Sequence, residues 1–221
     1  NYRWTNKVTL TIADGASSNL GGIVTTDEFD VSFADVGFTA DLRNDSVNLT
    51  GSMDNSAADN PVSGGVLALD LSTGPLYLAG GRIYKGEITS SGAHDLVATI
   101  SGTLDGVTLD GTLDMTQFQE SDADVINGLT LNGTIALGEA LSANTSLGQH
   151  AILFGSDNDH VAQTVRGTGT IQFGRDLAGD FLENVSPETL TFGPDITIQG
   201  GLSSLIFANY YSFGSHGPID S

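Results

Sequence analysis

The chain of 221 residues contains no cysteine and only seven lysine and arginine residues. The lack of cysteine excludes disulfide bonds and thiolate metal sites. Lys and Glu, which commonly fill the exposed faces of helices, are both scarce, so long helices are not expected. No apolar run approaches the roughly 18 residues that a membrane-spanning helix needs, so we expect no membrane insertion.

Acidic residues greatly outnumber basic ones, and the formal net charge is −20. No Lys or Arg occurs between Lys85 and Arg166, whereas eleven acidic residues do. Such a surface repels nucleic acids and anionic lipids, so neither is expected as a partner. All but six of the 27 acidic residues are aspartates, which are typical of turns.

The sequence begins without a methionine and without a signal peptide. We therefore expect a processed or excised piece of a longer protein. Glycine is abundant, at 29 residues, but proline is not, at five, so the composition is not that of a disordered linker.

One pattern recurs along the chain: three to six alternating Val, Leu, Ile, Phe and Thr residues, followed by Gly, Asp, Asn or Ser. The period of two predicts short strands with one buried face. The clearest examples are residues 7–15, 45–51, 65–74, 127–138, 166–174 and 189–201.

The stretch GTLDGVTLDGTLD, residues 102–114, shows how tightly the strands follow one another. One or two turn residues separate the apolar side chains of Leu104, Val107, Leu109 and Leu113, which leaves no room for a helical crossover. Three short strands per coil, stacked about 4.8 Å apart, satisfy this spacing and predict an all-β fold, a β-solenoid. With roughly 20 to 25 residues per coil, the chain supplies about nine or ten coils.

Residues 70–201 resemble a β-strand-repeat region of large bacterial surface, adhesin-like proteins. The matching phrases are LALDLSTGPLYLAGGRIYKGEI, SGTLDGVTLDGTLDMTQ, NGLTLNGTIALG, VRGTGTIQFG and LTFGPDITIQGG, in that order. The resemblance implies a right-handed parallel β-helix of the pectin-lyase-like kind and a location outside the cell or on its surface. The chain before about residue 60 fits the strand pattern but not these phrases.

Nothing in the composition indicates a linker between domains. The polar stretch at residues 52–65 is the best candidate for a boundary, but we interpret it as a long loop that protrudes from one corner of the solenoid. We therefore predict a single β-helix domain over residues 1–221.

Enzymes with this fold cleave acidic polysaccharides, which requires cations for binding and a carboxylate pair or a base for chemistry. We expect Asp105, Asp110 and Asp114 to be corner residues facing water. The alternation places the mixed charges of the segment GGRIYKGEI, residues 80–88, on a solvent face, and its two cations are too few to hold a polyanion. The chain is therefore predicted not to be an enzyme, and no cofactor is expected.

The four histidines lack the paired spacing of a metal site and are predicted to be exposed loop residues: His94, His150, His160 and His216. The loop GSDNDH, residues 155–160, offers Asp157 and Asp159 as calcium ligands. A plain turn is the alternative, because the nonapeptide of calcium-binding β-rolls is absent.

Two further groups of residues are candidates for modification or contact. Acceptors for N-glycosylation occur at Asn44, Asn48, Asn132, Asn144 and Asn184. Aromatic residues cluster at the two ends of the chain, where they are fragment ends, form a cap or contact a neighbouring copy: Tyr2, Trp4, Phe207, Tyr210, Tyr211 and Phe213.

These observations favour a non-catalytic structural or adhesive element of a bacterial surface protein, whose partners could include surface glycans. One alternative is a subunit of an extracellular filament that is joined end to end through homotypic contacts. A second alternative is a module that binds or cleaves polysaccharides.

Overall fold

The computed structural model describes residues 3–6, 10–13, 17–20, 23–26, 31–34, 46–55, 65–70, 74–92, 94–118, 120–138, 149–156, 160–174, 179–201, 204–208 and 219–220. Side chains are described from Val47 onward. In this part of the chain the fold is all-β, with 24 strands and no helix. It accordingly contains no helix that could serve as a membrane span.

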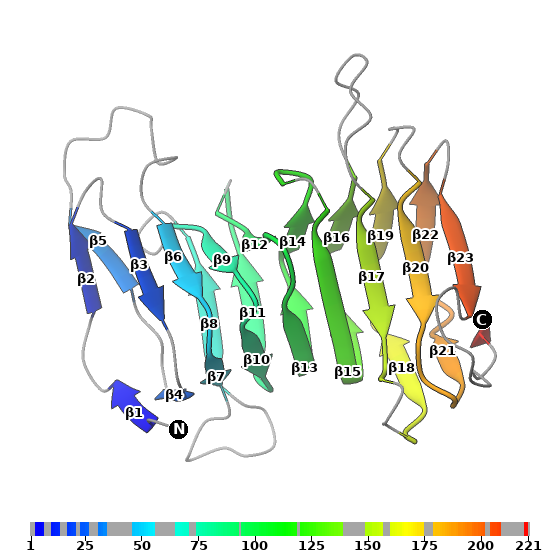
Figure 1. Ribbon diagram of the computed structural model, residues 1–221, viewed down its shortest axis with the longest axis horizontal. Coiled ribbons are helices and arrows are strands. Elements are labelled where there is room, and N and C mark those ends of the chain that lie inside the picture. Colours follow the sequence, from blue (N-terminus) through cyan, green and yellow to red (C-terminus); the bar gives the residue numbers. More distant parts are fainter. Residues whose placement is uncertain are drawn as a thin grey trace.

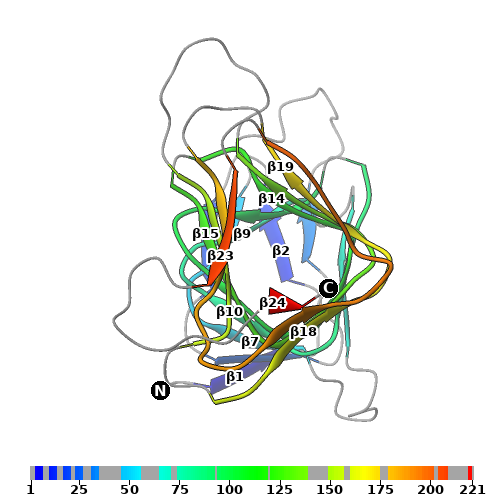
Figure 2. The same ribbon diagram turned by 90° about the vertical axis from the view of Figure 1, so that its right-hand side faces the viewer.

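The strands follow one another around the faces of an elongated stack (Figure 1), and the view along the stack shows them enclosing a common interior (Figure 2). The first face contains β1 (Arg3–Asn6), β4 (Ile23–Thr26), β7 (Ser52–Asp54), β10 (Arg82–Tyr84), the first part of β13 (Thr103–Asp110), the first part of β15 (Asp122–Leu131), β17 (Ala151–Phe154), β20 (Phe181–Asn184) and β23 (Leu205–Ala208). The second face contains β8 (Val66–Leu69), β11 (Glu87–Ser90), the second parts of β13 and β15, β18 (Gln163–Arg166), β21 (Leu190–Phe192) and β24 (Ile219–Asp220). The third face contains β3 (Ser17–Leu20), β6 (Ser46–Leu49), β9 (Leu76–Leu78), β12 (Leu96–Ala98), β14 (Thr112–Met115), β16 (Thr134–Leu137), β19 (Thr170–Phe173) and β22 (Thr197–Gly200).

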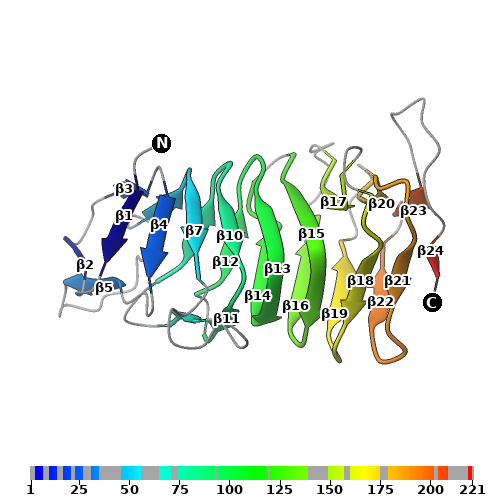
Figure 3. The ribbon, with the colours of Figure 1, turned by 90° about the horizontal axis from the view of Figure 1, so that it is seen from below.

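All pairs of named strands in the described residues are parallel. The first two faces form one 14-stranded sheet, because β13 and β15 run across both, and the third face is an 8-stranded sheet. β2 (Leu10–Ala13) and β5 (Val31–Ala34) form a separate two-stranded sheet. Within the two large sheets, each strand that is not at an end pairs with strands of the preceding and following passes, which Figure 3 shows along the length of the stack. This arrangement is consistent with the predicted β-solenoid.

The interior consists of rows of apolar side chains that run along the stack. Alternate residues of each strand face inward, so strands that pair in register place their inward residues above one another. On the third face one such row passes through seven successive strands: Val47, Leu76, Leu96, Leu113, Ile135, Ile171 and Ile198. The first six of these side chains are buried, and Ile198, on the last strand, is partly buried. Stacking therefore joins apolar faces, each too small to form a core alone, into one continuous core.

Glycines at the corner between the second and third faces let successive passes approach closely. A Cβ atom at Gly133 would lie 1.8 Å from the carbonyl oxygen of Gly111, the equivalent residue one pass earlier. The same carbonyl accepts a hydrogen bond from the backbone N–H of Thr134 at 2.8 Å. Only glycine fits here, because any side chain would separate the two backbones and break this bond.

Two local expectations differ from the structure. The apolar residues of the segment 102–114 were expected to be separated by turn residues, but residues 103–110 form the single strand β13, whose register shifts between Asp105 and Val107. This irregularity bends the strand around the corner between two faces without ending it. The predicted loop at residues 52–65 begins instead with the strand β7, which pairs with β4 and β10.

Candidate binding groove

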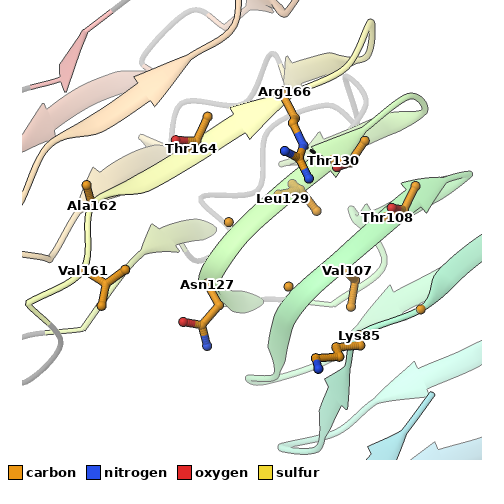
Figure 4. Close-up of a pocket in the computed structure, with 13 residues that line it drawn as sticks. Lys85, Val107, Thr108, Asn127, Leu129, Thr130, Val161, Ala162, Thr164 and Arg166 are labelled. Atoms are coloured by element: carbon orange, nitrogen blue, oxygen red, sulfur yellow. Dashed lines mark hydrogen bonds between the residues drawn. The ribbon is translucent and has the colours of Figure 1, made fainter. Parts of the chain in front are cut away.

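A groove lies on the outer surface where β13, β15 and β18 run side by side across the second face. It encloses about 420 Å³ and extends to the corner residues Lys85 and Gly86, which lie between β10 and β11. Figure 4 shows Lys85 and Arg166 at different ends of this surface, with β13 and β15 between them. We refer to this feature as the groove.

The floor of the groove is low because glycines occupy the corner of three successive passes. Gly86, Gly106 and Gly128 all have a positive φ, at 74°, 61° and 81°, and all line the groove. Lys85 and Asn127 also adopt the left-handed conformation, with φ of 59° and 58°. The sharp corner thus presents backbone in place of side chains along its length.

The wall of the groove arises from a lengthening of this corner. Val125 on β15 pairs with Phe154, 29 residues later, whereas Leu129 on the same strand pairs with Val165, 36 residues later. The later pass therefore has seven more residues at the corner than the pass before it. Val161 and Ala162, at the end of this longer corner, are exposed and line the groove.

A buried glutamine joins the wall to the floor. The side-chain oxygen of Gln163 accepts a hydrogen bond from the backbone N–H of Gly128 at 2.8 Å, and its amide nitrogen donates to the carbonyl of Val161 at 3.0 Å. Gln163 is 1% exposed. Its two hydrogen bonds satisfy a buried amide and hold both sides of the groove in place.

The groove has no acidic residue among the described residues that line it. It nevertheless contains two of the seven cations of a chain with 27 acidic residues. Nε of Arg166 donates to Oγ1 of Thr130 at 3.0 Å, which directs the guanidinium along the floor. Nζ of Lys85 lies 4.9 Å from the centre of the Tyr84 ring, a cation–π contact. The lining therefore offers an anion positive charge and no carboxylate of its own, and Glu87, which pairs with Thr108, lies next to it.

The neighbouring Arg82 has a structural role. As predicted, Arg82 and Lys85 are exposed, and Glu87 is partly exposed. The guanidinium of Arg82 pairs with the carboxylate of Asp105, which is fully buried. Nδ2 of Asn127 donates to the same carboxylate at 2.7 Å.

The expectation that Asp105 faces water is therefore wrong. Arg82 and Asn127 cover its side chain at this corner, and their guanidinium and amide satisfy the buried carboxylate. Asp110 is exposed, as predicted. Asp114 is partly exposed and accepts hydrogen bonds from the N–H and the hydroxyl of Thr116, which is the turn chemistry expected of aspartate.

The expectation of exposed histidines is wrong for His94 and His150, which are 4% and 0% exposed. Both ring nitrogens of His150 have acceptors: Nδ1 lies 2.8 Å from Oδ1 of Asp180, and Nε2 lies 2.8 Å from the carbonyl oxygen of Phe118. His160 is exposed, as predicted, and His216 lies outside the described residues.

Two carboxyl groups on the first face have altered acidity. Burial and the nearby charge of Asp124 raise the pKa of Asp122 to about 6, against the opposing effects of a hydrogen bond from Ala151 and the charge of His150. Burial also raises the pKa of Asp124, two residues along β15. A raised pKa beside a second carboxyl is common at catalytic sites, but burial alone produces the same effect in a structural residue. Neither residue lines the groove.

Several predicted site residues fall outside the described part of the chain. These are the calcium candidates Asp157 and Asp159, the acceptors Asn44 and Asn144, and the aromatic residues Tyr2, Tyr210, Tyr211 and Phe213. Trp4 belongs to β1, but its side chain is not described. Within the described residues, no group of three or more His, Asp and Glu side chains could hold a metal ion.

The remaining predicted residues differ in their accessibility. Asn132 is exposed and Asn48 is partly exposed, whereas Asn184 is fully buried and donates to the carbonyl of Glu188 at 2.9 Å. Asn184 is thus inaccessible to a modifying enzyme once the chain has folded. Phe207, on β23, stacks on Phe181 with a centroid distance of 5.4 Å.

Comparison of the chain with models of known protein families, with curated proteins and with solved structures found no match. Inferences about function therefore depend on the residues and their geometry.

Proposed function

We propose that the chain is a right-handed parallel β-helix that serves as a non-catalytic structural and adhesive element of a bacterial surface protein, outside the cell or on its surface. The proposal includes membership of the β-strand-repeat regions that residues 70–201 resemble. The main path of the 14-stranded sheet passes through nine strands, which supports a stack of about nine coils.

The observation that carries this proposal is the unbroken core row from Val47 to Ile198 on the third face. Each strand in this row except the last, β22, is hydrogen-bonded to the strands before and after it, so bending the stack would break backbone bonds and separate packed side chains. A rigid rod of this kind suits spacing and display at a surface.

The placement of the chemically reactive side chains supports a role without catalysis. The buried carboxylate of Asp105 is neutralised by Arg82, and the buried imidazole of His150 is held by Asp180. These groups join successive coils and are enclosed by protein, which is the arrangement of structural polar groups.

A second candidate function is that of a filament subunit, and the exposure of β23 favours it. Ile206 continues the inward row of Ile152 and Leu182, yet it is 50% exposed, and its neighbour Leu205 is 51% exposed. Among the described residues β23 pairs only with β20, so its other edge can accept a further strand. Addition of a second copy at this edge would be head to tail and would propagate.

Two measurements on the purified chain test the proposal. Negative-stain electron microscopy should show short rods of uniform width, and compact spheres would contradict it. Incubation with pectate, alginate and neutral glycans, with and without calcium, should release no reducing ends or unsaturated products. Turnover that disappears in Asp122→Asn would identify the carboxyl pair of β15 as catalytic and would overturn the non-catalytic role.

A further inference from the structure

We propose that the groove binds an oligosaccharide whose sugars carry carboxylates, with Arg166 holding one carboxylate and Lys85 another. This inference deepens the adhesive part of the proposed function and rests on it, because it names the ligand class and the residues that recognise it.

The positions of the two cations follow from the register of the strands. Glu87 pairs with Thr108, Thr108 with Thr130, and Thr130 with Arg166, so the coil of Lys85 and that of Arg166 are three strand spacings apart. At the usual spacing this is about 14 Å along the stack. Two cations so far apart cannot share one small anion, and they suit separate charges on an extended ligand.

Arg166 is arranged to receive a carboxylate. Thr130 engages only its Nε, and within the described residues no other group is bonded to the two terminal nitrogens. A guanidinium in this state can bind a carboxylate through two parallel hydrogen bonds. Lys85, which is exposed at the other end, adds a positive charge with rotatable donors.

The surface between the cations matches sugar hydroxyls. The hydroxyls of Thr108 and Thr164 line the groove and have no protein partner among the described residues. Asn127, which is exposed at the corner, adds an amide. Hydroxyl and amide groups both donate and accept, as sugar hydroxyls do.

The groove is less suited to other anionic chains. Its strands β13, β15 and β18 are each paired on both sides, so an acidic peptide cannot add to them as a further strand. None of the described lining residues is aromatic, so nucleic acid bases have no ring on which to stack.

The test uses the full chain, with titration of a galacturonate hexamer followed by isothermal calorimetry at low salt. We expect saturable binding that weakens as salt is added, and no binding of a neutral glucose hexamer. Arg166→Gln and Lys85→Gln should each weaken binding at least tenfold. Ala162→Glu, which places a negative charge on the groove wall, should do the same.

The matched control is Gln199→Glu, which introduces the same residue and the same change of net charge at an exposed position of β22 on the third face. This variant should bind within twofold of the wild type, and circular dichroism should show that all variants are folded. Equal losses in Ala162→Glu and Gln199→Glu would mean that only overall charge matters, which overturns the proposal.

Two further results would also overturn it. Absence of saturable binding to the galacturonate hexamer would remove the groove as a site and leave the structural role intact. Binding of a hexaglutamate peptide as tight as that of the sugar would assign the groove to acidic peptides. Shortening of the hexamer by the wild type would instead contradict the non-catalytic function while leaving the binding site in place.

Discussion

His150 and Asp180 form a fully buried pair in which Nδ1 of the imidazole lies 2.8 Å from Oδ1 of the carboxylate. Nε2 faces the carbonyl oxygen of Phe118, which can only accept, so Nε2 carries a hydrogen. The hydrogen bond between His150 and Asp180 requires a second hydrogen, which lies on Nδ1 of His150 or on Oδ1 of Asp180. The three residues precede β15, β17 and β20, so this network ties three successive coils together at one corner.

Replacement of His150 by leucine should therefore destabilise the fold. It leaves Asp180 buried without the imidazole, and loss of one partner of a buried pair costs about 3 kcal/mol or more in the free energy of unfolding. Urea unfolding followed by circular dichroism measures this difference. The control is His160→Leu at an exposed position, for which we expect a change within about 0.5 kcal/mol. Equal stability of the two variants would show that the pair does not support the fold.

Asp122→Asn should stabilise the protein at pH 7. The folded pKa of about 6 lies above the ordinary value of 3.8, so the folded state holds its proton more tightly than the unfolded state. The wild type consequently loses stability as the pH rises from about 4 to 6, and this loss is complete at pH 7. Because Asp122 is partly exposed, screening reduces the gain on substitution to about 1 kcal/mol.

The same comparison at pH 3.5 should show a much smaller difference between Asp122→Asn and the wild type, since the aspartate is then protonated in the folded state and mostly protonated in the unfolded state. Asp110→Asn, at an exposed position, controls for the removal of one negative charge. A stability gain that is the same at both pH values would contradict the assignment of the raised pKa to Asp122.

Gly133→Ala should be among the most damaging small substitutions. Its Cβ would overlap the carbonyl oxygen of Gly111, and the coils would have to separate, at a cost of about 3 kcal/mol or more. The neighbouring Asn132→Ala, at an exposed position, should change the free energy of unfolding by less than about 0.5 kcal/mol. A tolerated alanine at 133 would show that the corner is looser than the backbone hydrogen bonds indicate.

Ile206→Asp should reduce end-to-end association if the chain forms filaments. The substitution places a charge on an apolar side chain that is half exposed on β23. Sedimentation velocity at increasing concentration, with and without calcium, should show larger species for the wild type than for the variant. Val66→Asp, on the second face and 46% exposed, is the control. A wild-type protein that stays monomeric at all concentrations would exclude the role of filament subunit and leave the proposed role as a surface element.

The period of two was sufficient to predict the strands and their inward residues from the sequence. Leu104, Leu109 and Leu113 all lie in the core, as the alternation indicates. The corners were less predictable, because a turn residue can point outward or inward. Asp105 and Asp110 have the same sequence context, yet only Asp105 lies where the register of the strand shifts, and its carboxylate is buried beneath Arg82.

Contacts between residues far apart in the sequence could not be predicted from the local pattern either. His150 is buried because Asp180, 30 residues later, lies beside it in the next coil. The groove depends on the alignment of Lys85 with Arg166, three coils later. The number of residues between paired positions of successive coils is not constant, because successive corners differ in length. The scarcity of cations was visible in the sequence, but their meeting in one groove was not.

A regular stack of parallel coils sets the distances between residues of one outward row, and measuring these distances tests the fold most directly. Asn48, Ala136 and Gln199 occupy this row on the third face, with Ala136 four strands and Gln199 six strands after Asn48. The absence of cysteine allows spin labels to be attached at single introduced cysteines. Electron–electron double resonance should give narrow distributions, centred near 19 Å for Asn48→Cys with Ala136→Cys and near 29 Å for Asn48→Cys with Gln199→Cys, apart from a similar linker contribution in both. Broad distributions, or a second distance no longer than the first, would contradict the stack.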